Sequence, residues 1–270
     1  MRAFACHLQF EFFSGLRNKS LLMMYYLMPL GFFAVVGSVM SELNPFFREM
    51  AIPSMVTFAI LTGTIMGLPS PLLEAREKGI FRNFRVHGVP AANILLIPAL
   101  TAGIHLGVVT LIITFTAPLL FSAPLPSNWL LFFLGALTFL ITGAGLGVLI
   151  GIVAGNNRTC FLLAQMIYLP GMLLGGLMIP TDQLPQFIGW FSRILPTTYA
   201  MDAMLSLGWG EPVLNIWPLG GILVLLAGGI LSFVLAGYLF SWDQNNYTRR
   251  GPSFLAALVL IPFILGAIFL

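Results

Sequence analysis

Between Val86 and Asn157 the sequence contains no Asp, Glu, Lys or Arg, and shorter charge-free stretches recur along most of the chain. A charged side chain at the centre of a bilayer costs about 2.5–3.5 kcal/mol on insertion scales, so lipid can be the solvent for such stretches. Only 8% of the residues are charged, whereas a soluble domain carries about a quarter. The sequence therefore predicts an all-α, polytopic helical membrane protein.

Six segments are predicted as membrane spans, because a span needs about 20 mostly apolar residues. Charged residues bound the first two, and turn-forming clusters at 122–128 and 155–158 divide much of the remainder. A further segment, 254–270, is shorter, and whether it crosses the membrane as a seventh span stays open. The six predicted spans are 21–40, 52–73, 93–121, 129–153, 159–179 and 216–240.

Composition excludes several other classes of protein. Two cysteines, Cys6 and Cys160, provide no disulfide framework, and the three histidines are scattered, so we expect no metal site and no cofactor. The net charge of +3 is too small to indicate a nucleic-acid partner. Gln9 and Glu11 interrupt the apolar core that a signal peptide needs. We therefore expect neither a cleaved leader nor a soluble module.

The distribution of Lys and Arg predicts a multi-pass protein of the cell (plasma or inner) membrane with a cytoplasmic N-terminus. In that orientation ten basic residues lie on the cytoplasmic side, and only Arg48 and Arg193 lie outside. Such a bias in short loops is the positive-inside signal. The ten are Arg2, Arg17, Lys19, Arg76, Lys78, Arg82, Arg85, Arg158, Arg249 and Arg250.

Residues 1–19 have the pattern of an amphipathic helix. Apolar residues recur every four positions, and polar residues lie elsewhere on the helical wheel. The apolar set is Phe4, Leu8, Phe12 and Leu16, and the polar set is His7, Glu11, Ser14 and Asn18. We predict a helix that lies in the headgroup region. The alternative is an ordinary lead-in to the first span.

The loop 74–90 holds the densest cluster of charge in the chain. Ile80, Phe81 and Phe84 share one face of a predicted short helix, and Arg82 and Arg85 lie on another. Two interpretations stay open: a docking peg with exposed aromatics for a cytoplasmic partner, or a solvated basic loop that touches lipid headgroups. The breakers that bracket this helix are Gly79, Gly88 and Pro90.

The glycines of the fourth predicted span favour close packing of helices. Gly147, Gly151 and Gly155 make two successive small-xxx-small steps, in a setting too apolar for a phosphate loop. The only lysines, Lys19 and Lys78, belong to no P-loop sequence. We therefore expect no catalytic residues and no nucleotide hydrolysis by that route.

The segment 175–199 is predicted to form an outer cap that partly re-enters the membrane. Its prolines divide it into short helices, and its aromatics have the helical spacing or the interfacial character of a gate or an anchor. Non-helical backbone at that depth must be covered by protein or line a wet cavity. The candidate gate residues are Pro180, Pro185, Phe187, Trp190, Phe191, Pro196 and Tyr199.

These three segments, in this order, resemble the permease subunit of ABC-2 type transporters, a family of drug, antibiotic and polysaccharide exporters. The N-terminal helix corresponds to the family's connecting helix, and the loop 74–90 looks like its Glu-x-Gly-rich coupling helix. The segment 175–199 is similar to its Gly-Gly…Pro…Leu-Pro…Leu-Pro-x-x-Tyr signature. The resemblance covers residues 1–243 and leaves 244–270 as a C-terminal extension.

The resemblance implies a six-span permease that pairs with a second copy or a paralogue in the lipid bilayer. A separate ATP-binding cassette protein would drive it, and the missing P-loop fits that division of labour. The dimer interface would lie on the first and fifth spans, with the glycines of the fourth span as the competing candidate. Residues that would contact the ATPase are Glu74, Glu77, Gly79, Ile80, Phe81, Arg82, Phe84 and Arg85.

The transported substrate is predicted to be a hydrophobic or amphipathic, drug- or antibiotic-like compound, since the outer segment is long and the spans are rich in aromatics. Export of a lipid or glycan stays open, as does an ATP-independent channel. His105 is the only ionisable side chain predicted deep in a span. Either it is hydrogen-bonded to a neighbouring helix, or it is a polar contact in the translocation path.

Overall fold

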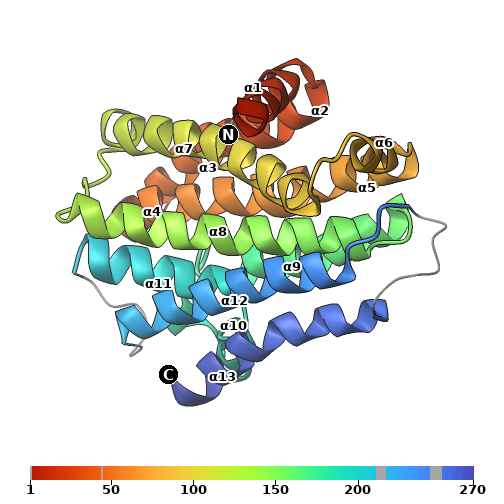
Figure 1. Cartoon of the computed structure of the whole chain (residues 1–270). Helices are drawn as coiled ribbons and strands as arrows, with labels where there is room; N and C mark the ends of the chain where they lie inside the picture. Colours follow the sequence, from red (N-terminus) through yellow and green to blue (C-terminus); the bar gives the residue numbers. More distant parts are fainter. Residues whose placement is uncertain (1, 44, 211–216, 244–250) are drawn as a thin grey trace.

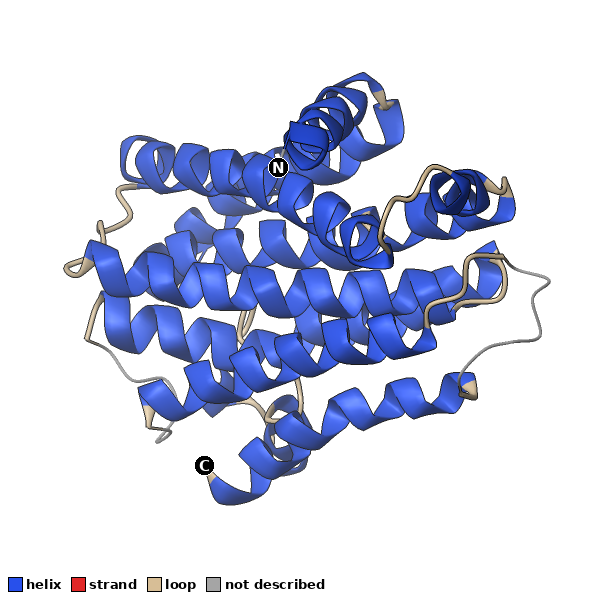
Figure 2. Ribbon diagram, viewed as in Figure 1, coloured by secondary structure: helices blue, strands red, loops and turns tan. Residues whose placement is uncertain are grey.

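The computed structural model describes residues 2–43, 45–210, 217–243 and 251–270, and every regular element in these ranges is a helix (Figure 2). The predicted all-α class is therefore confirmed. Five helices in the described part are long and apolar enough to cross a membrane. They are Lys19–Leu43, Phe47–Glu77, Ala91–Phe121, Trp129–Val153 and Leu219–Leu239, which correspond to predicted spans one to four and six.

Each of the first two spans contains a short π-helical stretch. The first consists of α2 (Lys19–Leu22), η1 (Met23–Leu27) and α3 (Met28–Leu43), and the second of α4 (Pro45–Leu61), η2 (Thr62–Gly67) and α5 (Pro69–Glu77). The two π-helical stretches touch: a Cβ atom on Gly67 would lie 2.8 Å from the Tyr25 ring. Wider π turns of this kind are frequent at functional sites.

The fifth predicted span ends earlier than expected. We predicted 159–179, whereas α9 covers Asn157–Leu174 and the chain turns at Gly175 and Gly176, whose φ is 85°. A left-handed residue ends a helix, and glycine takes that conformation without a steric cost. α9 is also less apolar than the five long helices, because it carries Asn157, Arg158 and Gln165.

α8 (Trp129–Val153) lies at the centre of the bundle, between α7 (Ala91–Phe121) on one side and α11 (Pro196–Gly208) and α12 (Pro218–Leu239) on the other (Figure 1). The glycines of α8 let the neighbouring helices approach. A Cβ atom on Gly151 would lie 2.8 Å from the Pro69 carbonyl oxygen, and one on Gly145 would lie 2.8 Å from that of Gly229. Of the three glycines predicted to pack closely, Gly147 and Gly151 lie against the second span of the same subunit, whereas a Cβ atom on Gly155 would meet no atom within 4 Å.

The C-terminal run packs along α12 as η4 (Ser253–Leu260) and α13 (Ile261–Phe269) (Figure 1). Phe263 is buried, and its carbonyl oxygen accepts a hydrogen bond of 3.3 Å from the Tyr199 hydroxyl. Because η4 is a 3₁₀ helix, which rises about 2 Å per residue, the run extends roughly 30 Å, close to the thickness of a hydrocarbon core. The predicted residues Arg249 and Arg250 lie outside the described ranges.

Candidate functional site

The loop predicted to dock a partner forms two short helices at one end of the bundle (Figure 1). α5 ends at Glu77, and α6 (Ile80–Val86) follows after a tight turn. Gly79 takes a left-handed conformation there (φ 71°), which suits glycine. Lys78 forms an exposed ion pair of 2.9 Å with Glu74, one helical turn earlier. The predicted short helix between glycine breakers is thus confirmed.

Phe81 corrects the predicted docking face. Its side chain is only 2% exposed, and its ring lies 5.7 Å from that of Phe240, just after α12. Phe84 is half-buried, with its ring 5.3 Å from that of His7. The expectation that Phe81 is an exposed aromatic is therefore wrong, because its ring fills a contact within the subunit.

The two arginines of α6 contact the segment that follows α12. The Arg82 guanidinium lies 4.0 Å from the Asp243 carboxylate, and the Arg85 guanidinium lies 6.0 Å from the centre of the Trp242 ring. Such exposed contacts stabilise only weakly. They nevertheless hold the arginine side of α6 near the segment after α12, and other residues of α6 form its exposed face.

The exposed face of α6 carries Ile80, Asn83 and Val86, spaced three residues apart. Ile80 is 42% exposed and Val86 is 79% exposed. Glu77, the last residue of α5, is exposed as well. We call Glu77, Ile80, Asn83 and Val86 the α6 outer face.

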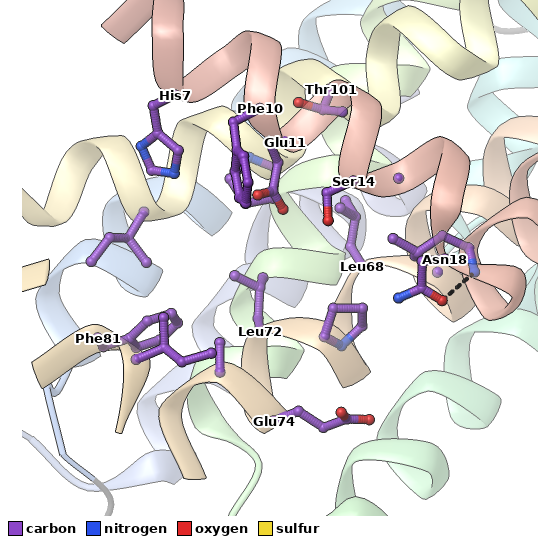
Figure 3. A pocket seen from close by; sticks show the side chains of 18 of the residues that line it. His7, Phe10, Glu11, Ser14, Asn18, Leu68, Leu72, Glu74, Phe81 and Thr101 are labelled. Carbon is purple, nitrogen blue, oxygen red and sulfur yellow. Dashed lines mark hydrogen bonds between the residues drawn. The ribbon is translucent and has the colours of Figure 1, made fainter. Parts of the chain in front are cut away.

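A cavity of about 390 Å³ lies between the N-terminal helix α1 (Arg2–Arg17), the α5–α6 pair and the start of α7 (Figure 3). Its walls are mainly apolar and include Leu68 and Leu72. Tyr25 of η1 and Gly67 of η2 also line it, so both π-helical stretches border the cavity. The polar side chains of α1 that line it are His7, Glu11, Ser14 and Asn18 (Asn18 is the residue just after the helix).

The orientation of α1 differs from that of an ordinary amphipathic surface helix. The predicted helix is present, but its polar side chains line the cavity, as Figure 3 shows for Glu11 and Ser14. Phe10 and Phe13 are exposed, at 69% and 49%. Burial raises the pKa of Glu11, and the nearby His7 partly offsets this rise.

The outer segment folds into the short helices that its prolines predict. After η3 (Thr181–Gln183), α10 (Gln186–Ser192) begins immediately behind Pro185, and α11 begins at Pro196. The end of α10 is anchored, because the Ser192 hydroxyl donates a 2.7 Å hydrogen bond to the Leu174 carbonyl.

The aromatics of this segment fall into two groups. Phe187, Trp190 and Phe191 are exposed, and their rings meet edge to face at 5.1 and 5.7 Å. Tyr199 is fully buried, with its hydroxyl bonded to α13, so the expectation of an interfacial tyrosine is wrong. Among the candidate prolines, Pro185 is exposed, Pro180 is half-buried and Pro196 is buried.

A family model described as "ABC-2 type transporter" matches residues 3–208 of the chain, a range that contains α1, the α5–α6 pair and the outer segment. The chain belongs to the ABC-2 type transporter family. Two curated relatives extend this finding. The "ABC transporter G family member 20" of Dictyostelium discoideum is 26% identical over 78% of this chain and 29% of its own length. The "Probable multidrug ABC transporter permease YbhR" of Escherichia coli strain K12 is 22% identical over 64% of this chain and 48% of its own length.

The chain thus spans less than half the length of the curated relatives that it matches. Family membership and the apolar helices together make this ABC-2 protein a multi-pass membrane protein. The resemblance to ABC-2 type transporters, inferred from residues 1–19, 74–90 and 175–199, is confirmed.

Arg76 is a residue of this ABC-2 protein that the sequence pattern did not single out. It is buried, and its guanidinium donates hydrogen bonds to the Ile152 and Ala154 carbonyls at the end of α8. The last carbonyls of a helix have no partner within it and carry partial negative charge, so a cation there is favourable. Arg76 therefore ties the α5–α6 pair to α8. The neighbouring sequence does not reveal this role, because the Ile152 carbonyl that Arg76 binds lies 76 residues later in the chain.

His105 joins α1 to α7. Its Nδ1 atom lies 2.8 Å from the Tyr26 hydroxyl, and its ring stacks on that of Phe12 at 4.5 Å. A Cβ atom on Gly15 would lie 3.1 Å from its Nε2 atom, so α1 and the His105 ring are in close contact at this glycine. Of the two interpretations of His105, a hydrogen bond to a neighbouring helix is observed.

Asp202 is a second residue that sequence reasoning missed. It lies in α11, between the predicted fifth and sixth spans, and is almost fully buried. The signal available in the sequence was one acidic residue within an otherwise apolar helix, placed between the predicted fifth and sixth spans. Buried acids in membrane proteins are rare and usually functional.

Proposed function

We propose that this protein is the membrane subunit of an ABC exporter, which moves a hydrophobic or amphipathic, drug-like compound outward. A separate ATP-binding cassette protein would supply the energy, and the chain itself would be no enzyme. The observation that carries this proposal is the family match over residues 3–208, which includes both the α5–α6 pair and the outer segment. The multidrug permease named among the relatives favours a drug-like compound over a glycan.

The α6 outer face is the proposed docking surface for the ATPase. It is an exposed, partly apolar surface at the end of the bundle, next to arginines that contact the segment after α12. Interfaces favour apolar anchors with a charged rim. Arg76 supports this docking role, because its hydrogen bonds would couple a movement of α5 directly to α8.

The α5–α6 end is proposed to face the cytoplasm. The end of α8 and the start of α9 lie at that same end of the bundle (Figure 1). Arg158, near the start of α9, is therefore on the same side of the membrane as Arg82 and Arg85. This clustering of basic residues agrees with the positive-inside rule. The N-terminus would then also be cytoplasmic.

A dimer through the first and fifth spans is proposed, with a second copy or a paralogue as the partner. Both α3 and α9 have an outward apolar face: Val35, Val39 and Leu43 on α3, and Leu162, Met166 and Leu173 on α9. Cysteine pairs along α9 should crosslink two subunits in membranes. Efficient crosslinking through α12 instead would refute this arrangement.

The exposed ring cluster of Phe187, Trp190 and Phe191 is proposed as part of an outer gate. Its anchor at Ser192 lets α10 move as a rigid piece about one fixed end. Removing Phe187 and Phe191 should then raise the basal leak of substrate. Normal activity per molecule at lower yield would show that the rings only anchor α10 in the membrane.

The function is tested by ATPase stimulation. The permease would be co-expressed with a candidate ATP-binding cassette protein from the same organism and reconstituted in liposomes. ATP hydrolysis would then be measured across a panel of candidate compounds. We expect lipophilic drugs to stimulate hydrolysis and glycans to leave it unchanged. Substrate flux that is equally fast without ATP would favour a channel instead.

A further inference from the structure

The cavity beneath α1 contains one carboxylate that the proposed function does not use. Glu11 points into the cavity (Figure 3) and forms no hydrogen bond or ion pair with the residues that the structure describes. The other acidic residue of the lining, Glu74, is neutralised by its 2.9 Å ion pair with Lys78. Glu11 is therefore the carboxylate of the lining that has no ion-pair partner among the described residues.

The remaining lining suits an apolar molecule. Leu68, Leu72 and Phe81 form one wall, and the rings of Phe10 and Tyr25 flank Glu11. Aromatic faces attract cations as well as apolar groups. A volume of about 390 Å³ lies within the range of small-molecule sites.

The direction of α1 provides an independent reason to expect a ligand. An amphipathic helix on a membrane protein normally turns its polar side to water and its apolar side to lipid or protein. Here His7, Glu11 and Ser14 line the cavity, whereas Phe13 does not line it and is exposed. Polar groups directed into a membrane protein usually face a wet cavity or a bound polar group.

We propose that this cavity binds a lipophilic cation, with the Glu11 carboxylate facing the positive charge and the apolar walls enclosing the body of the molecule. The proposal rests on the function proposed above and narrows its substrate class. The chemistry required is a single positive charge on an apolar framework. An exported compound has this chemistry, and so does a lipid with an amine headgroup; we assign the cavity to the exported compound.

The test measures occupancy of the cavity without any ATPase. Ser14, which lines the cavity and is exposed, is changed to Cys in a Cys6→Ser background, and the permease is placed in phosphatidylglycerol nanodiscs. The rate of maleimide labelling is then measured with tetraphenylphosphonium. Native Cys6 is exposed on the same helix but does not line the cavity, so the wild-type protein reports unspecific protection.

Tetraphenylphosphonium should slow labelling of Cys at position 14 several-fold and leave native Cys6 unaffected. Glu11→Gln keeps the shape of the side chain and removes its charge, so about tenfold more of the cation should be needed for equal protection. Glu42→Gln, a matched change at an exposed residue that does not line the cavity, should have no effect. Tetraphenylborate, of the same shape and opposite charge, should not protect at equal membrane uptake.

Three results would overturn the proposal. Equal protection by tetraphenylborate would mean that the cavity binds apolar molecules without distinguishing their charge. Unchanged protection in a folded Glu11→Gln variant would remove Glu11 from the site. Loss of protection when phosphatidylethanolamine is added would assign the cavity to a lipid headgroup. The labelling assay contains no ATP, so its result is independent of transport. ATP-driven export of the cation without protection of Cys at position 14 would refute this inference alone. Protection without any export would refute the proposed function alone.

Discussion

Arg76 and His105 each act at a contact between helices: Arg76 caps α8, and the His105 ring stacks on Phe12 of α1. Glu11 differs from them, because it is partly buried and forms no hydrogen bond or ion pair with the described residues. An ionisable group held in this way is a candidate for binding rather than for stability.

Replacing Arg76 by Met should destabilise the protein, because two carbonyls at the end of α8 lose a charged donor. Hydrogen bonds to charged groups contribute about 1.5–3 kcal/mol. We expect a clearly lower midpoint of thermal unfolding in detergent, with partial recovery in Arg76→Lys, which keeps the charge but not the two-pronged geometry. An Arg76→Met variant as stable as the wild type would show that the cap is unimportant.

Binding of tetraphenylphosphonium should weaken as the pH falls from 8 to 5. Burial raises the pKa of Glu11, so its carboxylate is protonated, and loses its charge, at a higher pH than an exposed glutamate. His7, Glu74 and Lys78 also line the cavity, so Glu11→Gln is the control that removes the Glu11 carboxylate and leaves these three groups in place. The slope should be shallower in Glu11→Gln than in the wild type. Identical pH profiles would exclude Glu11 as the titrating group.

At the scale of elements, hydropathy was sufficient to place most helices. The spans 129–153 and 93–121 were predicted within two residues, because charge and turn residues mark their ends. α9 was predicted too long, since only the backbone shows that Gly176 takes a left-handed conformation. The burial of Phe81 could not be predicted either, because its partner Phe240 lies about 160 residues later in the chain. Residues that touch across such distances leave no local pattern in one sequence.

The two faces of α6 should respond differently to mutation. Asn83→Glu with Val86→Glu alters exposed residues that, unlike Ile80, do not line the cavity, so the cassette protein should no longer copurify while thermal stability is kept. Phe81→Ala removes a buried ring, which typically costs about 3–5 kcal/mol, and should lower stability first. Copurification that survives the double change would place the docking surface elsewhere.

The glycines of α8 provide a matched pair for testing helix packing. A Cβ atom on Gly151 would approach the Pro69 backbone, whereas one on Gly155 would meet no atom within 4 Å. Gly151→Ala should therefore lower the unfolding temperature, because backbone cannot move aside as a flexible side chain can. Gly155→Ala should change it little. Equal effects of the two substitutions would contradict the observed packing.

At the scale of the whole molecule, α8 and the second span form the packed centre of the bundle. They connect the α5–α6 pair, the cavity beneath α1 and the outer segment. Family and fold were predictable, because they depend on apolar length and on three segments in a fixed order. The cavity was not, since α1, η1 and α7 meet there only after folding.

The most direct test of the central claim is transport in inside-out membrane vesicles that contain the permease and its cassette protein. Uptake of a fluorescent lipophilic cation would be followed with ATP, with ADP, and in the Asn83→Glu/Val86→Glu variant, which leaves the cavity lining unchanged. We predict uptake with ATP in the wild type, and none with ADP or in the variant. Equal uptake under all three conditions would contradict an ATP-driven exporter whose energy enters through α6.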